Sequence, residues 1–387
     1  MGGTKNIMEK ERLKNILEGK EKYNVLHITK KGLNGCTYYR NMTPLVYLQT
    51  AKKITGHIES SITTTEGTHK ETGDKIQALD ATLINWADIV VFSRYYNPEF
   101  MKLVDAYSMA TKDMGKVMLY ETDDDFFNIP EHNGVYREAS DALPLVKTLM
   151  ERADGYTTTT KRLGKLLTDY SDKPVFILPN SLELDLFEGA EFKERPRTNK
   201  IRIGWAGGNT HALDLVQIIP AMVQIQKKYP HVEFVGLGSA GLRDLFTTIP
   251  SFKVEWHEFT KNVMDYPMKL VELDLDIGLI PLENYEFNFN KSAVKWEEYS
   301  AAKMATIYAK IPPYSDAIVD GVTGLGVTDP SSNQEWFDAI VKLVNDVELR
   351  VRLARNAHEE IIKNYDMSKN YLLWDRAYKY FLEEVYK

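Results

Sequence analysis

Short apolar segments alternate with helix-like segments along the whole chain, and this alternation constrains the fold more than any other feature. In the first half the apolar segments are residues 23–28, 88–93, 116–121 and 174–178. A second series comprises residues 201–205, 232–237, 254–256, 275–281 and 305–309. Apolar strands of this length that alternate with helices predict parallel sheets with both faces covered. We therefore expect an α/β protein.

Helices are expected between these strands and at the end of the chain. Thr43 and Pro44 resemble an N-cap and a first-turn residue, which predicts a helix through about residue 53. Further helices are expected over residues 76–87, from 97–99 onward, and over 142–153, 161–170, 334–344, 349–363 and 369–386.

A charged segment with glycine and proline, EGAEFKERPRTNK at residues 188–200, interrupts the pattern as an interdomain linker would. The 387 residues also exceed the size at which a single core stops growing. We expect two Rossmann-like domains with parallel sheets that face each other across a cleft. The first domain covers residues 1–187, and the second begins at residue 201.

Composition excludes several classes of protein. A net charge of −7 argues against a protein devoted to holding nucleic acid. The single cysteine, Cys36, excludes an intrachain disulfide and a cysteine-based zinc cluster. No apolar run reaches about 18 residues, and the polar N-terminus lacks a signal-peptide core. We expect a cytoplasmic protein without a transmembrane segment.

Residues 279–302, LIPLENYEFNFNKSAVKWEEYSAA, contain the strongest candidate site. An apolar strand ends here and a helix follows, on which Lys291, Ser292, Lys295 and Glu298 are expected to share one face. Two cations and a hydroxyl near a helix N-terminus suit a diphosphate, and a carboxylate farther along can accept hydrogen bonds from ribose hydroxyls. The alternative is a solvated face with Glu–Lys pairs.

A second candidate lies after the strand at residues 201–205. Gly207 and Gly208 would let the backbone approach a phosphate closely, and His211 could reach the phosphate or the sugar. An ordinary strand-to-helix turn would use the same glycines, and His211 could be a surface residue beside it.

Five segments occur in an order that resembles GT-B glycosyltransferases of the group-1/family-4 type. They are PNSLELDLF (179–187), IGWAGG (203–208), EFVGLGS (233–239), KSAVKWEEYSA (291–301) and DGVTGLGV (320–327). The resemblance covers most of residues 175–365. It implies that residues 1–187 bind the acceptor, that residues 201–365 bind the donor, and that residues 366–387 form a helix packed back on the first domain. It also implies transfer without a metal or other cofactor and with retention of configuration.

One position departs from that family. The family commonly has two glutamates eight positions apart, and Asn290 occupies the first position whereas Glu298 matches the second. An amide can bind a sugar hydroxyl, but it supplies no negative charge near a developing oxocarbenium ion. This departure leaves the identity of the sugar open.

The first half contains an acidic run, Glu121-Thr122-Asp123-Asp124-Asp125, at the end of a strand. Open α/β sheets bind ligands at this edge, so Asp123 and Asp124 are candidate catalytic residues and Asp125 a candidate acceptor contact. The alternatives are a divalent-cation site and an acidic helix N-terminus capped by Asp124 or Asp125. Further candidate acceptor contacts are Gly35, Arg40 and Arg94.

The residues and the resemblance together predict a glycosyltransferase that moves a sugar from a UDP- or GDP-sugar to a hydroxyl of a glycan, lipid-linked sugar, protein or modified base. Lys291, Lys295 and the Gly207–Gly208 backbone would stabilise the diphosphate leaving group. Three alternatives remain: a nucleotide-sugar epimerase, an enzyme acting on modified DNA bases, and a GT-B-like scaffold without activity. The oligomeric state is left open.

Overall fold

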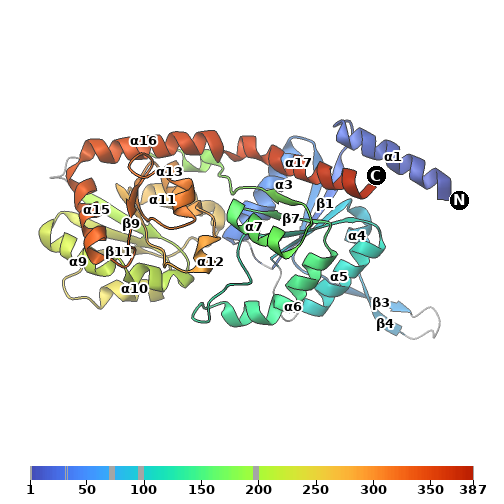
Figure 1. Cartoon of the computed structure of the whole chain (residues 1–387), viewed down its shortest axis with the longest axis horizontal. Helices are drawn as coiled ribbons and strands as arrows, with labels where there is room; N and C mark the ends of the chain where they lie inside the picture. Colours follow the sequence, from blue (N-terminus) through green and yellow to red (C-terminus); the bar gives the residue numbers. More distant parts are fainter. Residues whose placement is uncertain are drawn as a thin grey trace. The chain divides into compact units, whose positions relative to one another are not determined.

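The chain divides into two compact α/β units (Figure 1). The computed structural model describes residues 2–30, 32, 34–68, 75–94, 100–194 and 200–386. Unit 1 comprises Met1–Pro179 and Met367–Lys387, and unit 2 comprises Asn180–Asp366.

Unit 1 is built on a six-stranded parallel sheet with the order β2-β1-β5-β6-β7-β8. The strands are β1 (Tyr23–Ile28), β2 (Ile54–Glu59), β5 (Ile89–Ser93), β6 (Val117–Thr122), β7 (Gly155–Thr158) and β8 (Val175–Ile177). Strands β1, β5 and β6 are buried almost throughout, which matches their apolar sequence. These central strands confirm the expected parallel architecture.

Alternate residues of these strands face two different cores, because side chains along a strand point to opposite faces. Leu26 and Phe92 pack with α5 (Met101–Asp113) and α6 (Tyr136–Arg152). Val25 and Val91 belong to the other core, which includes α3 (Thr43–Thr50) and α17 (Met367–Tyr386). Helices therefore cover both faces of the sheet.

The last helix, α17, packs on unit 1, as expected. Trp374, Tyr378 and Phe381 are buried in its core. Two polar contacts accompany this packing. The Tyr23 hydroxyl donates to Asp375 Oδ1 at 2.9 Å, and Tyr378 Oη lies 3.0 Å from His27 Nε2. The helix α1 (Gly2–Leu17) also contacts α17.

Unit 2 contains the second six-stranded parallel sheet, with the order β11-β10-β9-β12-β13-β14. The strands are β9 (Ile201–Ala206), β10 (Val232–Leu237), β11 (Val254–His257), β12 (Ile277–Ile280), β13 (Ala305–Ala309) and β14 (Leu325–Val327). Helix α9 (Ile219–Lys228) contacts α15 (Asn333–Asn345), and α16 (Val347–Asn364) contacts β13.

Both sheets reverse their strand order beside their first strand. In unit 1, β1 lies between β2 and β5; in unit 2, β9 lies between β10 and β12. The chain proceeds from such a strand first toward one edge of the sheet and later toward the other. A crevice forms where the two directions part, at the carboxyl ends of β1 and β5 in unit 1 and of β9 and β12 in unit 2. Each unit therefore has one topologically favoured place for a ligand.

The helix expected over residues 76–87 is wrong. This segment forms the strand β4 (Lys75–Leu79) and then the short helix α4 (Thr82–Trp86). Strand β4 pairs antiparallel with β3 (Thr64–Thr68), and this pairing with the preceding strand overrides the local helical pattern. Asp80 accepts a hydrogen bond from the Thr82 amide at 3.0 Å in the turn between β4 and α4.

Three other expectations differ in detail. The helix expected through residue 53 ends with α3 at Thr50. The helix expected over residues 142–153 is α6, which begins six residues earlier, at Tyr136. The helix start at residues 97–99 lies outside the described residues, and α5 begins at Met101.

Candidate active site

The turn after β9 contains Gly207 and Gly208, whose surroundings differ. A Cβ atom at Gly207 would lie 2.5 Å from the Trp205 ring and 2.8 Å from Lys295 Nζ, so only glycine fits there. A Cβ atom at Gly208 would meet no atom within 4 Å, so this residue borders open space. The second position of the turn therefore leaves the backbone accessible to a ligand.

The expectation that Lys291 and Ser292 lie on the helix with Lys295 is wrong, because α13 (Val294–Ala301) begins after them. Both residues lie between α13 and the short helix α12 (Glu286–Phe289). The Lys291 amide donates to the Asn288 carbonyl at 3.3 Å, and Ser292 Oγ accepts from Asn180 Nδ2 at 3.0 Å. The bond between Lys291 and Asn288 closes a turn before the helix begins, and Asn180 holds Ser292 from a distant part of the chain. The shared helical face is therefore limited to Lys295 and Glu298.

Lys295 is held at the carboxyl end of β9. Its Nζ donates to the Ala206 carbonyl and lies 4.8 Å from the centroid of the Trp205 ring. The Ala206 amide donates to the Tyr299 hydroxyl at 2.7 Å, so side chains of α13 bind both backbone polar groups of Ala206. Burial lowers the pKa of Lys295 from 10.5 to about 8, with Lys291 adding to the effect and Glu298 opposing it. Near neutral pH the side chain is a cation held by neutral groups.

Glu298, the expected ribose ligand, lies one turn farther along α13. Its Oε2 accepts from the Tyr266 hydroxyl at 2.9 Å. Tyr266 is the first residue of α11 (Tyr266–Glu272), and burial followed by the charge of Glu298 raises its pKa well above the usual value. The tyrosine therefore remains a hydrogen-bond donor that fixes the carboxylate.

His211 lies in the short helix that follows Gly208, and its ring is bound to an aspartate. The distance from His211 Nδ1 to Asp214 Oδ2 is 2.6 Å. Asp214 Oδ1 also accepts from the Glu283 amide at 2.7 Å, which connects this segment to the chain after β12. Burial lowers the pKa of His211 to about 4; the bond to Asp214 opposes this shift, and the charges of Lys295 and Lys291 add to it. The ring is therefore neutral near pH 7.

Asn290 and Lys291 complete the predicted donor set. Asn290 is 9% exposed and ends α12. Lys291 Nζ lies 4.7 Å from the centroid of the Phe287 ring. Because both lysines influence the pKa of His211, the structure brings Lys291, Lys295 and His211 into one electrostatic environment. This environment, beside Gly207 and Gly208, lies at the reversal point between β9 and β12.

The corresponding edge of unit 1 holds Asp123 and Asp124, and both are ion-paired with Arg94. Arg94 Nη1 lies 2.9 Å from Asp123 Oδ1, and Arg94 Nη2 contacts Asp124 Oδ2. Nη1 also contacts Cys36 Sγ. Arg94 follows β5 and has a positive φ of 41°, a backbone conformation that costs some strain in a residue other than glycine. Asp123 and Asp124 therefore share one cation within unit 1.

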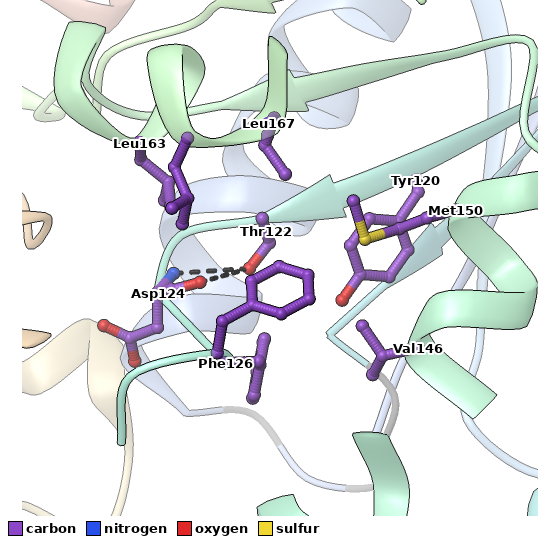
Figure 2. A pocket seen from close by; sticks show the side chains of 10 residues that line it. Tyr120, Thr122, Asp124, Phe126, Val146, Met150, Leu163 and Leu167 are labelled. Carbon is purple, nitrogen blue, oxygen red and sulfur yellow. Dashed lines mark hydrogen bonds between the residues drawn. The ribbon is translucent and has the colours of Figure 1, made fainter. Parts of the chain in front are cut away.

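Figure 2 shows the local setting of Asp124. Its backbone carbonyl and amide bond to Thr122 Oγ1, at 2.8 and 3.4 Å. The carboxylate points away from a group of apolar side chains that includes Phe126 and Leu163. No helix begins here, so the alternative of an acidic helix N-terminus does not apply.

Two predicted acceptor contacts are occupied inside unit 1. Arg40 is 2% exposed, pairs with Glu121 at 2.7 Å and donates to the Leu178 carbonyl. Asp125 is fully buried, and its carboxylate accepts from the amides of Phe127 and Asn128. This burial favours a structural role for both residues over contact with an acceptor.

Gly35 is placed differently from these two residues. It starts the short helix α2 (Gly35–Thr37), and open space borders the position of a Cβ atom there. Gly35 therefore stays a candidate acceptor contact, together with Arg94.

Comparison with solved structures gives matches over nearly the whole chain. Sucrose-phosphate synthase from Thermosynechococcus elongatus is 12% identical, with a TM-score of 0.66, over 94% of this chain and 100% of that one. HepE from Anabaena, solved with UDP-glucose, is 13% identical, with a TM-score of 0.66, over 92% and 99%. A glycosyltransferase from Rickettsia africae is 13% identical, with a TM-score of 0.62, over 95% and 99%.

The chain has the GT-B fold. The structural likeness is not accompanied by similarity of sequence: no protein-family model matches the chain, and no curated protein matches it. In this GT-B chain the reversal point of unit 2 carries the cations. In unit 1 the acidic run follows β6, the neighbour of β5, and reaches the reversal point through its ion pairs with Arg94.

Sequence reasoning missed Asp214 and Tyr266 as members of the GT-B chain's candidate site. Asp214 lies three residues after His211, a spacing that suits a contact within one helical turn and could have suggested the pair. Tyr266 lies 32 residues from Glu298, and no local pattern connects them.

No described group of three or more His, Cys, Asp or Glu side chains is arranged to hold a metal ion. Within the same residues, no helix is both long and apolar enough to cross a membrane.

Proposed function

We propose that the chain is a glycosyltransferase that transfers a sugar from a nucleoside-diphosphate sugar to an acceptor hydroxyl. The observation that carries this proposal is the position of Lys295, a buried cation bound to the Ala206 carbonyl at the reversal point of the second sheet. An anionic leaving group placed beside the Gly207–Gly208 turn would gain stabilisation as its negative charge develops. The GT-B fold makes a nucleoside diphosphate the natural leaving group.

A uridine donor is the first choice for this site. HepE was solved with UDP-glucose, and a TarM variant from Staphylococcus aureus was solved with UDP and the saccharides fondaparinux and α-GlcNAc-glycerol. Glu298, fixed by Tyr266, would accept hydrogen bonds from the ribose hydroxyls. The acceptor would be a glycan or another hydroxyl compound, with Gly35, Arg94 and the carboxylates of Asp123 and Asp124 as its candidate contacts.

Metal independence and retention of configuration belong to the same proposal. Lys291 and Lys295 supply two positive charges without a metal ion, so we expect transfer to continue in EDTA. Loss of turnover in EDTA that Mg²⁺ or Mn²⁺ restores would contradict this part of the proposal. The anomer formed by the enzyme, read by NMR of the product, would test retention.

A thermal-shift screen of the full chain with UDP, GDP and their sugar conjugates tests the donor. A nucleotide that binds only the folded state at about 100 times its Kd stabilises the protein by about 2.7 kcal/mol. Release of UDP or GDP, with and without a saccharide acceptor, tests turnover. Binding without turnover would indicate the inactive scaffold instead, and no stabilisation by any nucleotide would contradict the proposed function.

A further inference from the structure

The carboxylate of Asp214 joins the two loops that flank the reversal point of unit 2. It is 4% exposed and lies on α8 (Ala212–Val216). Its Oδ1 accepts from the Glu283 amide after β12, and its Oδ2 bonds to His211 Nδ1 after β9. One buried side chain therefore sets the relative position of both strand ends and the orientation of the histidine ring.

The bond to Asp214 also decides which ring nitrogen of His211 carries the proton. A carboxylate can only accept, so Nδ1 holds the hydrogen and Nε2 of a neutral ring has a free lone pair. The charged groups facing the ring are Asp214, Lys295 and Lys291. The Trp205 ring packs against it in a T-shaped arrangement, with 6.0 Å between the ring centroids. The side chain is 20% exposed, and Nε2 has no hydrogen-bond partner among the described residues.

An imidazole in this state distinguishes between parts of a nucleotide sugar. Its Nε2 cannot donate to a phosphate oxygen, whereas it can accept from a hydroxyl. The cations Lys291 and Lys295 are the groups suited to the phosphates, and Glu298 is the group suited to the ribose. With the phosphates and the ribose assigned to these groups, the remaining hydroxyls of the nucleotide sugar that His211 can bind are those of the transferred sugar.

We propose that His211 accepts a hydrogen bond from a hydroxyl of the transferred sugar, and that Asp214 is the positioning residue that holds the ring in this state. The inference rests on the proposed function and assigns a role in recognition of the sugar. It predicts a contact made by the nucleotide sugar and absent from the nucleoside diphosphate alone.

Asp214→Asn tests the inference with almost no change of shape. The remaining amide oxygen can still accept from the Glu283 amide, whereas the new NH₂ group faces His211 Nδ1 and donates to it. The ring proton then moves to Nε2, which loses its lone pair. Nitrogen-15 NMR of the ligand-free protein should show Nδ1 protonated in the wild type and Nε2 protonated in the variant.

The ligand measurements use UDP and UDP-glucose. In Asp214→Asn, the affinity for UDP should stay within about threefold, and kcat/KM for UDP-glucose should fall on the order of 10- to 100-fold, because a hydrogen bond is replaced by two opposed donors. His211→Phe should reproduce this selective loss without altering Asp214, and it serves if Asp214→Asn folds poorly. The control is Asp320→Asn, which alters another aspartate that accepts from a loop amide (Gly326, 2.7 Å). It should change neither the affinity for UDP nor kcat/KM for UDP-glucose.

Three results would overturn the inference. An equal loss of affinity for UDP and UDP-glucose would place the ring against the phosphates or show that the turn has moved. A wild-type ring protonated at Nε2 and not at Nδ1 would remove its basis. A protein that shows the expected ring proton but binds neither ligand would overturn the proposed function, and with it the sugar contact.

Discussion

The reversal points of the two sheets have the same topology and opposite chemistry. In unit 1 the cation Arg94 is ion-paired with Asp123 and Asp124. In unit 2 the cation Lys295 is bound to a backbone carbonyl and the face of a tryptophan ring, and it forms no ion pair within 4 Å among the described residues. A cation already neutralised by two carboxylates has little attraction left for an anion, whereas one held by neutral groups keeps its charge for a ligand.

This difference shows that the number of charged residues at a sheet edge does not define an anion site. The acidic run of unit 1 and the lysines of unit 2 are equally prominent in the sequence. What distinguishes them is the partner of each charge in the folded state. The experiments below test this distinction, beginning with the largest expected effect.

Replacing Lys295 by methionine should reduce kcat/KM on the order of 10²- to 10³-fold, because a preorganised charge at the leaving group would be lost. Methionine keeps an apolar stem against Trp205, so the melting temperature should change little. Transfer rates and thermal melts of the same samples measure both. Lys291→Met is the comparison variant. It should reduce kcat/KM less than Lys295→Met does, because Lys291 lies in the turn before α13 and not on the helix that holds Lys295 at β9. Normal turnover by Lys295→Met would contradict the proposal that the charge of Lys295 stabilises the leaving group.

Replacing Arg94 by methionine should have the opposite pattern. The side chains of Asp123 and Asp124 are only 12% and 17% exposed, so two carboxylates would lose their partner in a poorly solvated place. Denaturant titration should show a loss of about 1–3 kcal/mol in unfolding free energy, whereas calorimetry should show unchanged UDP affinity. The control Arg243→Met breaks an exposed pair with Asp244 and should cost less than about 0.5 kcal/mol. A large fall in UDP affinity in Arg94→Met would place part of the nucleotide site in unit 1.

Raising the pH should weaken UDP binding through Lys295. Its pKa is lowered from 10.5 to about 8, so the folded protein loses this proton at a lower pH than the unfolded chain does. Between these two values the contribution of the group to stability rises with pH, while the charge available to UDP disappears. Calorimetric affinity should fall about tenfold by roughly pH 9 if bound phosphate keeps the lysine protonated. Lys295→Met should lack this decline, and an equal decline in both proteins would assign it to another group.

The smallest expected effect comes from Gly208→Ala. Gly208 has a φ of −76°, and its Cβ position is open, so alanine should leave the melting temperature unchanged. A methyl group where the backbone would meet a phosphate should still weaken UDP binding, by about three- to tenfold. Gly241→Ala, an open position on α10 (Ala240–Thr247), is the control. Unchanged UDP affinity in Gly208→Ala would move the phosphates away from this turn.

The apolar pattern was sufficient to predict most of both sheets. Strands β10 and β13 and the helix α7 (Lys161–Tyr170) have the expected bounds. Strand β7 was missed because its sequence, GYTT, looks too polar for a buried strand. The hydroxyls of Thr157 and Thr158 are satisfied by Glu121 and by the Thr122 carbonyl, groups about 36 residues earlier in the chain that the local pattern does not reveal.

The sequence by itself determined the two series of strands, the final helix and the kinds of residue that follow each strand, because these depend on periodicity and on local turn chemistry. It indicated Lys295, Gly207 and His211 as neighbours of a phosphate site. Only the tertiary structure decided that Lys291 lies outside the helix, that Arg94 is ion-paired with Asp123 and Asp124, and that Asp214 fixes His211. The carbonyl that holds Lys295 is 89 residues away in the chain, and the amide that Asp214 binds is 69 residues away. The partner of a charge is set by which strand ends meet, and that choice is made by the packing of the whole sheet.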